Sequence, residues 1–199
     1  MDIQEICGNE HAKRAMEIAL VGDFPIEFIG MSEAKRCLAA YNTARYPDHA
    51  SEGDPGSSVV FPCPCGNFGD QQKTCTCKIK ELQEHWKLNA LTQPTLTTYT
   101  KRPPADTLIA HLDPSKRGET TADMMRRVRS AQRHTPKEYN LNKDLFSFLK
   151  AAIERFSLSQ DEVEFTIDVS RAIARLSQAD SILIQHLAEA LQYRRTGGV

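Results

Sequence analysis

Apolar residues at helical spacing dominate the second half of the chain. Between Leu145 and Phe156 six of them recur at steps of three and four, which predicts an amphipathic helix. Ile184, Leu187 and Leu191 follow the same spacing and predict a last helix near the end of the chain. Short connections between such helices favour a small bundle.

Two polar pairs in the same region resemble helix-capping boxes. Thr120 is followed by Asp123, and Ser159 is followed by Glu162. In a capping box the hydroxyl and the carboxylate each accept a hydrogen bond from a backbone N–H that the helix start leaves unpaired. We therefore expect one helix to begin at each pair, so that helix dominates this half of the protein.

The first 45 residues alternate between helix and strand patterns. Residues 12–19 place small apolar side chains on one face, and Gly22 ends this pattern. Residues 25–29 form a short apolar run that is consistent with a buried strand. Ser32 can then cap a second helix that continues to Arg45. This order is typical of an α/β layer.

Turn-forming residues interrupt the middle of the chain. Residues 46–58 read as a surface loop, and residues 59–61 as a second short strand. A helix is expected over 78–88. Residues 91–106 contain five threonines and three prolines without a clear period, so we expect an irregular connector there. Residues 107–111 are expected to form a third strand.

Composition is that of an ordinary globular protein. The 199 residues are 40% hydrophobic and 26% charged, with a net charge of −1. No apolar run approaches the roughly 20 residues of a membrane-spanning helix. No charged-then-apolar leader opens the chain, so we expect a cytoplasmic protein without a membrane partner. Its six cysteines are then expected to be reduced, which favours metal binding over disulfides.

Charge is unevenly distributed along the chain. Residues 1–62 carry 5 basic and 10 acidic residues, whereas residues 78–137 carry 12 basic and 6 acidic residues. The basic stretch is densest at four arginines: Arg126, Arg127, Arg129 and Arg133. They predict either a contact with nucleic acid or an acidic partner, or a solvated helix face that complements the acidic N-terminal part. No aromatic residue interleaves with them to stack on bases.

Four cysteines form the strongest chemical motif. Cys63-Pro-Cys65 and Cys75-Thr-Cys77 are two Cys-x-Cys pairs, and a glycine-containing loop at residues 66–70 allows the chain to reverse between them. Four thiolates suit a tetrahedral zinc ion. The alternatives are four reduced thiols without metal, or a redox dithiol, although the usual Cys-x-x-Cys spacing of that chemistry is absent.

Several motifs together resemble one family. The stretch Gly8–Ala19 resembles the opening helix of the magnesium-chelatase-like AAA+ ATPases of the ComM/YifB type. Pro62–Gly66 and Cys75–Cys77 are similar to the Cys-Pro-Cys-Gly signature of that family, and His186–Arg194 is similar to its closing helix. The resemblance implies a small, incomplete and truncated AAA+-like α/β core over residues 1–112, with a Cys-rich insert at 63–77. It also implies a lid-like helical domain over 113–199.

The same resemblance implies an ATP site that has degenerated. Of the nucleotide-binding residues only Gly30, Lys35 and Arg171 remain. The later glycines of the phosphate loop and its Ser/Thr are missing, as is the magnesium-binding acidic motif. Further departures fall at positions where the family carries polar or basic groups: Phe61, Thr97, Thr98, Asp161 and Phe165. We therefore expect neither ATP nor magnesium as a cofactor, and no ATPase activity.

Three functions compete. The leading hypothesis is a non-catalytic, zinc-stabilised binding or regulatory protein whose partner is another protein, with an intact related ATPase as the candidate. One alternative is a residual nucleotide-binding protein. The other is a nucleic-acid-binding module that uses the arginines at 126–133, because the intact relatives are linked to DNA processing.

Overall fold

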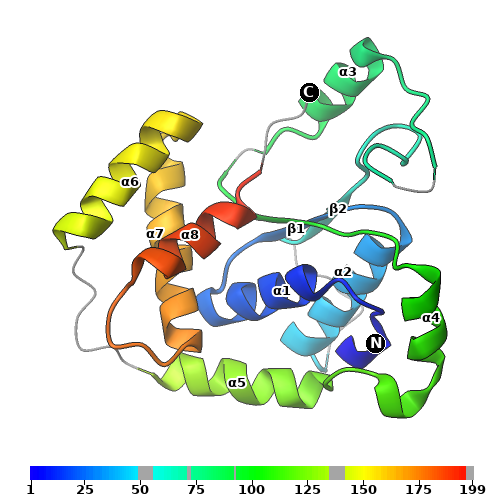
Figure 1. The fold of residues 1–199 in the computed structure, drawn as a ribbon, viewed down its shortest axis with the longest axis horizontal. Helices are drawn as coiled ribbons and strands as arrows, with labels where there is room; N and C mark the ends of the chain where they lie inside the picture. Colours follow the sequence, from blue (N-terminus) through cyan, green and yellow to red (C-terminus); the bar gives the residue numbers. More distant parts are fainter. Residues whose placement is uncertain (49–55, 71–72, 92, 135–141, 196–199) are drawn as a thin grey trace.

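Three short parallel strands form the only sheet within the described residues, which are 1–48, 56–70, 73–91, 93–134 and 142–195 of this computed structural model. The strand order is β2-β1-β3, where β1 is Ile26–Ile29, β2 is Ser58–Val60 and β3 is Leu96–Tyr99. Helices make up most of the rest (Figure 1). The expected helix-dominant α/β fold with a small sheet is confirmed.

The sheet has two unlike faces. Side chains alternate between the faces along a strand, so Ile26 and Phe28 of β1 lie on one face and Glu27 lies on the other. The Phe28 ring makes an edge-to-face contact with Tyr41 at 6.3 Å between ring centroids. Tyr41 belongs to α2 (Ser32–Arg45), which packs beside α1 (Glu10–Gly22). These two helices therefore cover the Phe28 face of the sheet.

The C-terminal half is helical, as its apolar spacing predicts. It contains α5 (Thr121–Arg133), α6 (Lys143–Phe156), α7 (Gln160–Leu176) and α8 (Ile184–Ala190), and a short 3-10 turn, η3 (Leu191–Tyr193), follows α8. Both expected capping boxes are present at the starts of α5 and α7. They fix where these two helices begin because each side chain pairs with a backbone N–H that would otherwise lack a partner.

One hydrophobic core joins the two halves of the chain. Buried residues of α1, α2, β1 and β3 share a single cluster with residues of α5 and α7, among them Met16, Phe28, Val128 and Ile173. A second, smaller cluster lies between α6 and α8. The division into domains at 112/113 stays a prediction.

The two ends that carry the family resemblance lie against each other. His11 of α1 stacks on Tyr193 of η3, with ring centroids 4.6 Å apart. Arg14 of α1 donates to the Glu189 carboxylate of α8 at 2.8 Å. The opening and closing motifs are thus complementary surfaces of one packing interface.

The expected positions of the third strand and its preceding connector were wrong. Residues 107–111 lie within helix α4 (Ala105–Leu112), and the strand β3 lies inside the stretch expected to be irregular. β-Branched threonines form the centre of β3, where Thr97 and Thr98 are buried beside β1. In α4, by contrast, no strand lies alongside to pair with Thr107 and Ile109 among the described residues, and Pro104 precedes the first helical turn.

A further helix, α3 (Ile79–Leu88), follows the cysteine-rich insert, as expected. Two other 3-10 turns, η1 (Ile3–Glu5) and η2 (Pro114–Lys116), complete the described elements. Among the described residues, no helix combines the length and the apolar character that crossing a bilayer requires.

Candidate metal centre

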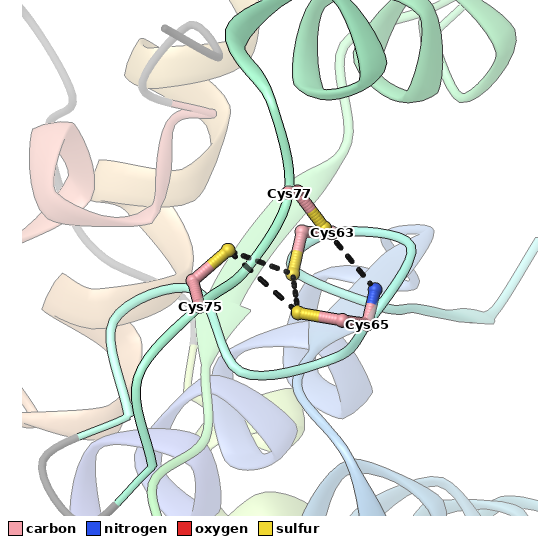
Figure 2. Close-up of side chains that lie close together, drawn as sticks. All are labelled: Cys63, Cys65, Cys75 and Cys77. Atoms are coloured by element: carbon pink, nitrogen blue, oxygen red, sulfur yellow. Dashed lines mark hydrogen bonds between the residues drawn. The ribbon is translucent and has the colours of Figure 1, made fainter.

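The four cysteine sulfurs of the insert converge on one point. Sγ of Cys63 lies 3.3 Å from Sγ of Cys65 and 3.7 Å from Sγ of Cys75, and the Cys65 and Cys75 sulfurs are 3.7 Å apart. The Cys77 sulfur lies within 4.8 Å of the others. Figure 2 shows the side chains directed toward one another from the two Cys-x-Cys pairs, which lie at either end of the loop.

Two of these distances match the geometry of a tetrahedral metal–thiolate site, and the Cys63–Cys65 separation of 3.3 Å is shorter. With zinc–sulfur bonds of about 2.3 Å, two ligands at the tetrahedral angle lie about 3.8 Å apart. The separations of the Cys75 sulfur from Cys63 and Cys65 are within 0.1 Å of this value. None of the four cysteines is in a disulfide. The cluster can therefore hold a metal ion, and a set of four sulfur donors is compatible with zinc.

The backbone of the insert shapes the cluster. Gly66 and Gly69 have φ values of 80° and 79°, in the left-handed region that glycine adopts without strain. The resulting turns let the backbone N–H of Phe68 donate to the Cys63 sulfur at 3.3 Å. The N–H of Cys65 likewise donates to the Cys77 sulfur at 3.4 Å (Figure 2). Such N–H groups stabilise thiolate ligands and orient them.

The electrostatics of the cluster favour a bound cation. Hydrogen bonds from the backbone N–H groups of Asn67 and Thr76 lower the pKa of Cys65 to about 5. Burial raises the pKa of Cys63, and its hydrogen bond with Cys65 raises it further. Thiols this close cannot all ionise unless a positive charge lies between them. A divalent metal supplies that charge.

The insert lies at the carboxyl end of the sheet. Cys63 follows β2 by three residues, and a Cβ added at Gly66 would come within 2.2 Å of the sulfur of Met31, which follows β1. Beyond β3, Arg102 forms an ion pair of 3.6 Å with Asp70 of the insert. Met31 and Arg102 were not singled out from the sequence. The signal that could have found them is their place just after neighbouring parallel strands, whose carboxyl ends share one edge.

The residues that were expected to remain from a nucleotide site are placed differently. Only Gly30 and Met31 separate β1 from α2. A Cβ at Gly30 would lie 2.0 Å from Oγ1 of Thr100, so this glycine permits close packing of two strand ends. The Lys35 ammonium lies over the Phe61 ring, 5.5 Å from its centroid.

Arg171 is on α7, where its guanidinium pairs with Asp168 one turn earlier, at 2.5 Å. The structure therefore places Gly30 between β1 and α2, Lys35 near the start of α2, and Arg171 in an ion pair on α7.

The four arginines of α5 have unlike environments. Arg127 bridges two carboxylates, those of Glu17 on α1 and Glu119. Arg126 pairs with Asp123 at 3.1 Å and is otherwise exposed, and Arg129 and Arg133 are exposed. The charge of Arg127 is therefore paired within the protein, whereas the other three arginines present their charges to solvent.

A known family matches the C-terminal region of the chain. Residues 117–194 match the family model described as the C-terminal region of the magnesium chelatase subunit ChlI. The match covers α5 to η3, the helices that were expected to form a lid-like domain. No curated protein matches the chain.

Proposed function

We propose that this chain, whose residues 117–194 match a magnesium chelatase family model, is a non-catalytic, zinc-stabilised binding protein of the cytoplasm. One observation carries the proposal. A four-sulfur cluster lies at the carboxyl edge of the parallel sheet, the edge at which α/β proteins usually bind their ligands. The metal then acts structurally: four protein ligands fill a tetrahedral site and leave no position open for a substrate.

The connection between β1 and α2 supports the absence of ATPase chemistry. A phosphate-binding loop needs several residues between strand and helix so that successive N–H groups can surround the phosphates. Here two residues make the connection, and the Gly30 N–H is already donated to the carbonyl of Val60 at 3.0 Å. Lys35, the candidate phosphate-binding lysine, is held over an aromatic ring. The later glycines of a phosphate loop, which would let the backbone approach the phosphates near Lys35, are absent from the sequence.

As partner we propose an intact ATPase of the same family. Two features support this choice. Of the family-matching helices, α5 and α7 pack on α1 and α8 packs on α7, so the chain keeps a lid-like surface in a defined position. Arg171 of that region remains exposed on α7 and is restrained by Asp168. A folded lid without its own catalytic loop can dock on a neighbouring subunit without turning over nucleotide.

Metal analysis of the purified protein tests the central proposal. We expect one zinc per chain, and substitution of Cys75 by serine should reduce this to well below half because a tetrahedral site loses one of four ligands. Cys7→Ser is the matched control, since Cys7 is a free cysteine outside the cluster. Chelation should lower the thermal midpoint of the wild type but leave that of Cys75→Ser unchanged. A metal-free wild type that also gives no cobalt–thiolate absorption would contradict the proposal.

Calorimetry with Mg-ATP tests the non-catalytic part. We expect no saturable heat up to millimolar nucleotide, which corresponds to a binding free energy weaker than about −4 kcal/mol. Saturable binding that is lost in Lys35→Ala would show a residual nucleotide site, and the second hypothesis would then replace the first.

One observation favours nucleic acid as a second candidate ligand. Arg126, Arg129 and Arg133 are spaced three and four residues apart, so they lie on one exposed face of α5. A basic stripe of this kind contacts phosphates. We expect any such binding to weaken steeply with salt, by a log–log slope near −3 for about three phosphates, and to be lost in an Arg129→Glu/Arg133→Glu variant. A salt-independent affinity would exclude this role.

A further inference from the structure

A charged cluster lies on the face of the sheet opposite α1 and α2. Glu27, on the central strand β1, has a side chain that is only 2% exposed. Its Oε1 lies 3.6 Å from Nη1 of Arg195, whose side chain is 13% exposed. A buried carboxylate on a central strand needs an opposite charge close by. Arg195, close to the C-terminus, provides it.

The same arginine attaches helix α3 to the molecule. Its guanidinium lies over the Trp86 ring, 4.9 Å from the ring centroid, and its Nη1 donates to the carbonyl of Asn89 at 2.5 Å. Trp86 is on α3, and Asn89 caps its end. Figure 1 shows α3 beyond the strands, on the other side from α1 and α2.

Within the described residues, few other contacts hold helix α3. Leu82 is its single buried residue, whereas Ile79 and Leu88 are 67% and 87% exposed. A hydrogen bond of 2.6 Å joins Nε2 of His85 to the carbonyl of Phe61, next to the cysteine insert. An element with so few buried apolar contacts opens at low free energy unless a specific contact closes it. Arg195 makes that contact from the far end of the chain.

The closed cluster is incompletely satisfied. Within the described part of the chain, Oε2 of Glu27, Nε1 of Trp86 and Nη2 of Arg195 are buried without a hydrogen-bond partner. Burial raises the pKa of Glu27, and the charge of Arg195 opposes that shift. Opening lets water reach all three atoms, so the closed and open arrangements are closer in free energy than a fully paired cluster would allow.

We propose that Arg195 is a latch that holds α3 on the sheet and thereby fixes the exit of the metal-binding loop at Cys77. Only Lys78 separates Cys77 from the first residue of α3, so release of the helix frees this ligand first. The C-terminal segment then controls access to the metal site. This regulation rests on the proposed function only for its consequence on metal, because Arg195 contacts Glu27, Trp86 and Asn89 and not the cysteines.

Fluorescence of the metal-free protein gives the first test. Trp86 is the single tryptophan of the chain, so its emission reports on α3 alone. Arg195→Ala should raise the acrylamide quenching constant at least twofold. Arg194→Ala is the matched control, because Arg194 lies over Phe156 and contacts Leu191 rather than α3. Unchanged quenching in Arg195→Ala would overturn the latch.

Alkylation of reduced, chelator-treated protein gives the second test. The rate at Cys77, resolved by peptide mass spectrometry, should rise at least threefold in Arg195→Ala, while Cys7 should react at the wild-type rate. Loss of Arg195 leaves the buried Glu27 carboxylate without an opposite charge. The double variant Glu27→Gln/Arg195→Ala removes this buried charge, so it serves as a folded second variant and should show the same increase in the Cys77 rate. Equal Cys77 rates in wild type and this double variant would also overturn the latch. Both readouts are independent of whether the protein binds zinc.

Discussion

At the scale of single residues, Gly30 has a steric role at the end of β1. Gly30 was expected as a remnant of a phosphate loop. In the structure it lies against Thr100, which follows β3, and both residues continue neighbouring strands. The need for a glycine here is steric: any Cβ would overlap the Thr100 hydroxyl. This contact could not be predicted, because β3, the strand that Thr100 follows, was expected elsewhere.

Replacement of Gly30 by alanine tests this steric role. We expect Gly30→Ala to lower the free energy of unfolding by about 1–3 kcal/mol, as overpacking commonly does. The loss should be clearly smaller in a Thr100→Ala background, where the overlapping Oγ1 is absent. Urea unfolding measures both, with Gly118→Ala as control, since a Cβ there would meet no atom closer than 3.9 Å. An equal loss in both backgrounds would show that Thr100 is not the cause.

At the scale of elements, the sequence predicted those features that residues close together in the chain determine. The capping boxes at Thr120 and Ser159 mark the true starts of α5 and α7, because a cap and its helix lie within four residues. The four-cysteine cluster was also predictable, since its ligands come in two close pairs. The position of β3 was not, because four threonine-rich residues become a strand only through pairing with β1. The contact of Glu27 with Arg195 joins residues 168 positions apart and leaves no local signal.

The α5 capping box makes a prediction about pH. The Thr120 hydroxyl and backbone N–H hydrogen bond to Asp123 and hold the pKa of its carboxyl below the ordinary value of 3.8. A carboxyl whose pKa is lower in the folded state stabilises the protein above pH 3.8, and this contribution is lost as the pH falls through the folded pKa. The stability difference between wild type and Asp123→Ala should therefore be constant near neutral pH and shrink below pH 3.8.

Urea midpoints measured from pH 7 downward provide the check on this capping box. In a Thr120→Ala background the change at Asp123 should depend less on pH, because the main hydrogen bond is gone. Thr120→Ala itself should cost about 1 kcal/mol, as is common for loss of a helix cap. A pH profile for Asp123→Ala that is flat through the acid range would contradict the capping interpretation.

At the scale of the whole molecule, charge and packing connect the two ends of the chain. The acidic N-terminal part and the basic middle part were expected to complement each other or to face separate partners. Glu17 of α1 is buried and accepts from both Arg14 and Arg127, so part of that charge is used internally. The stacked pair His11 and Tyr193 adds an apolar contact beside it. The family-matching helices are therefore completed by a helix from the opposite end of the sequence.

The hydrophobic core that both halves of the chain share predicts how stable fragments 1–112 and 113–199 are when they are separated. Val169, Ala172 and Ile173 of α7 lie in the same buried cluster as α1, so a fragment of residues 113–199 exposes them to water. We expect that fragment to lack a cooperative thermal transition by circular dichroism, because too little apolar surface stays buried to offset the entropy of ordering the helices. Mixing it with residues 1–112 should restore a transition, whereas the same mixture carrying Glu17→Ala should restore less, because both arginines then lose their shared carboxylate. A fragment that melts cooperatively at the midpoint of the full chain would instead establish residues 113–199 as an autonomous domain.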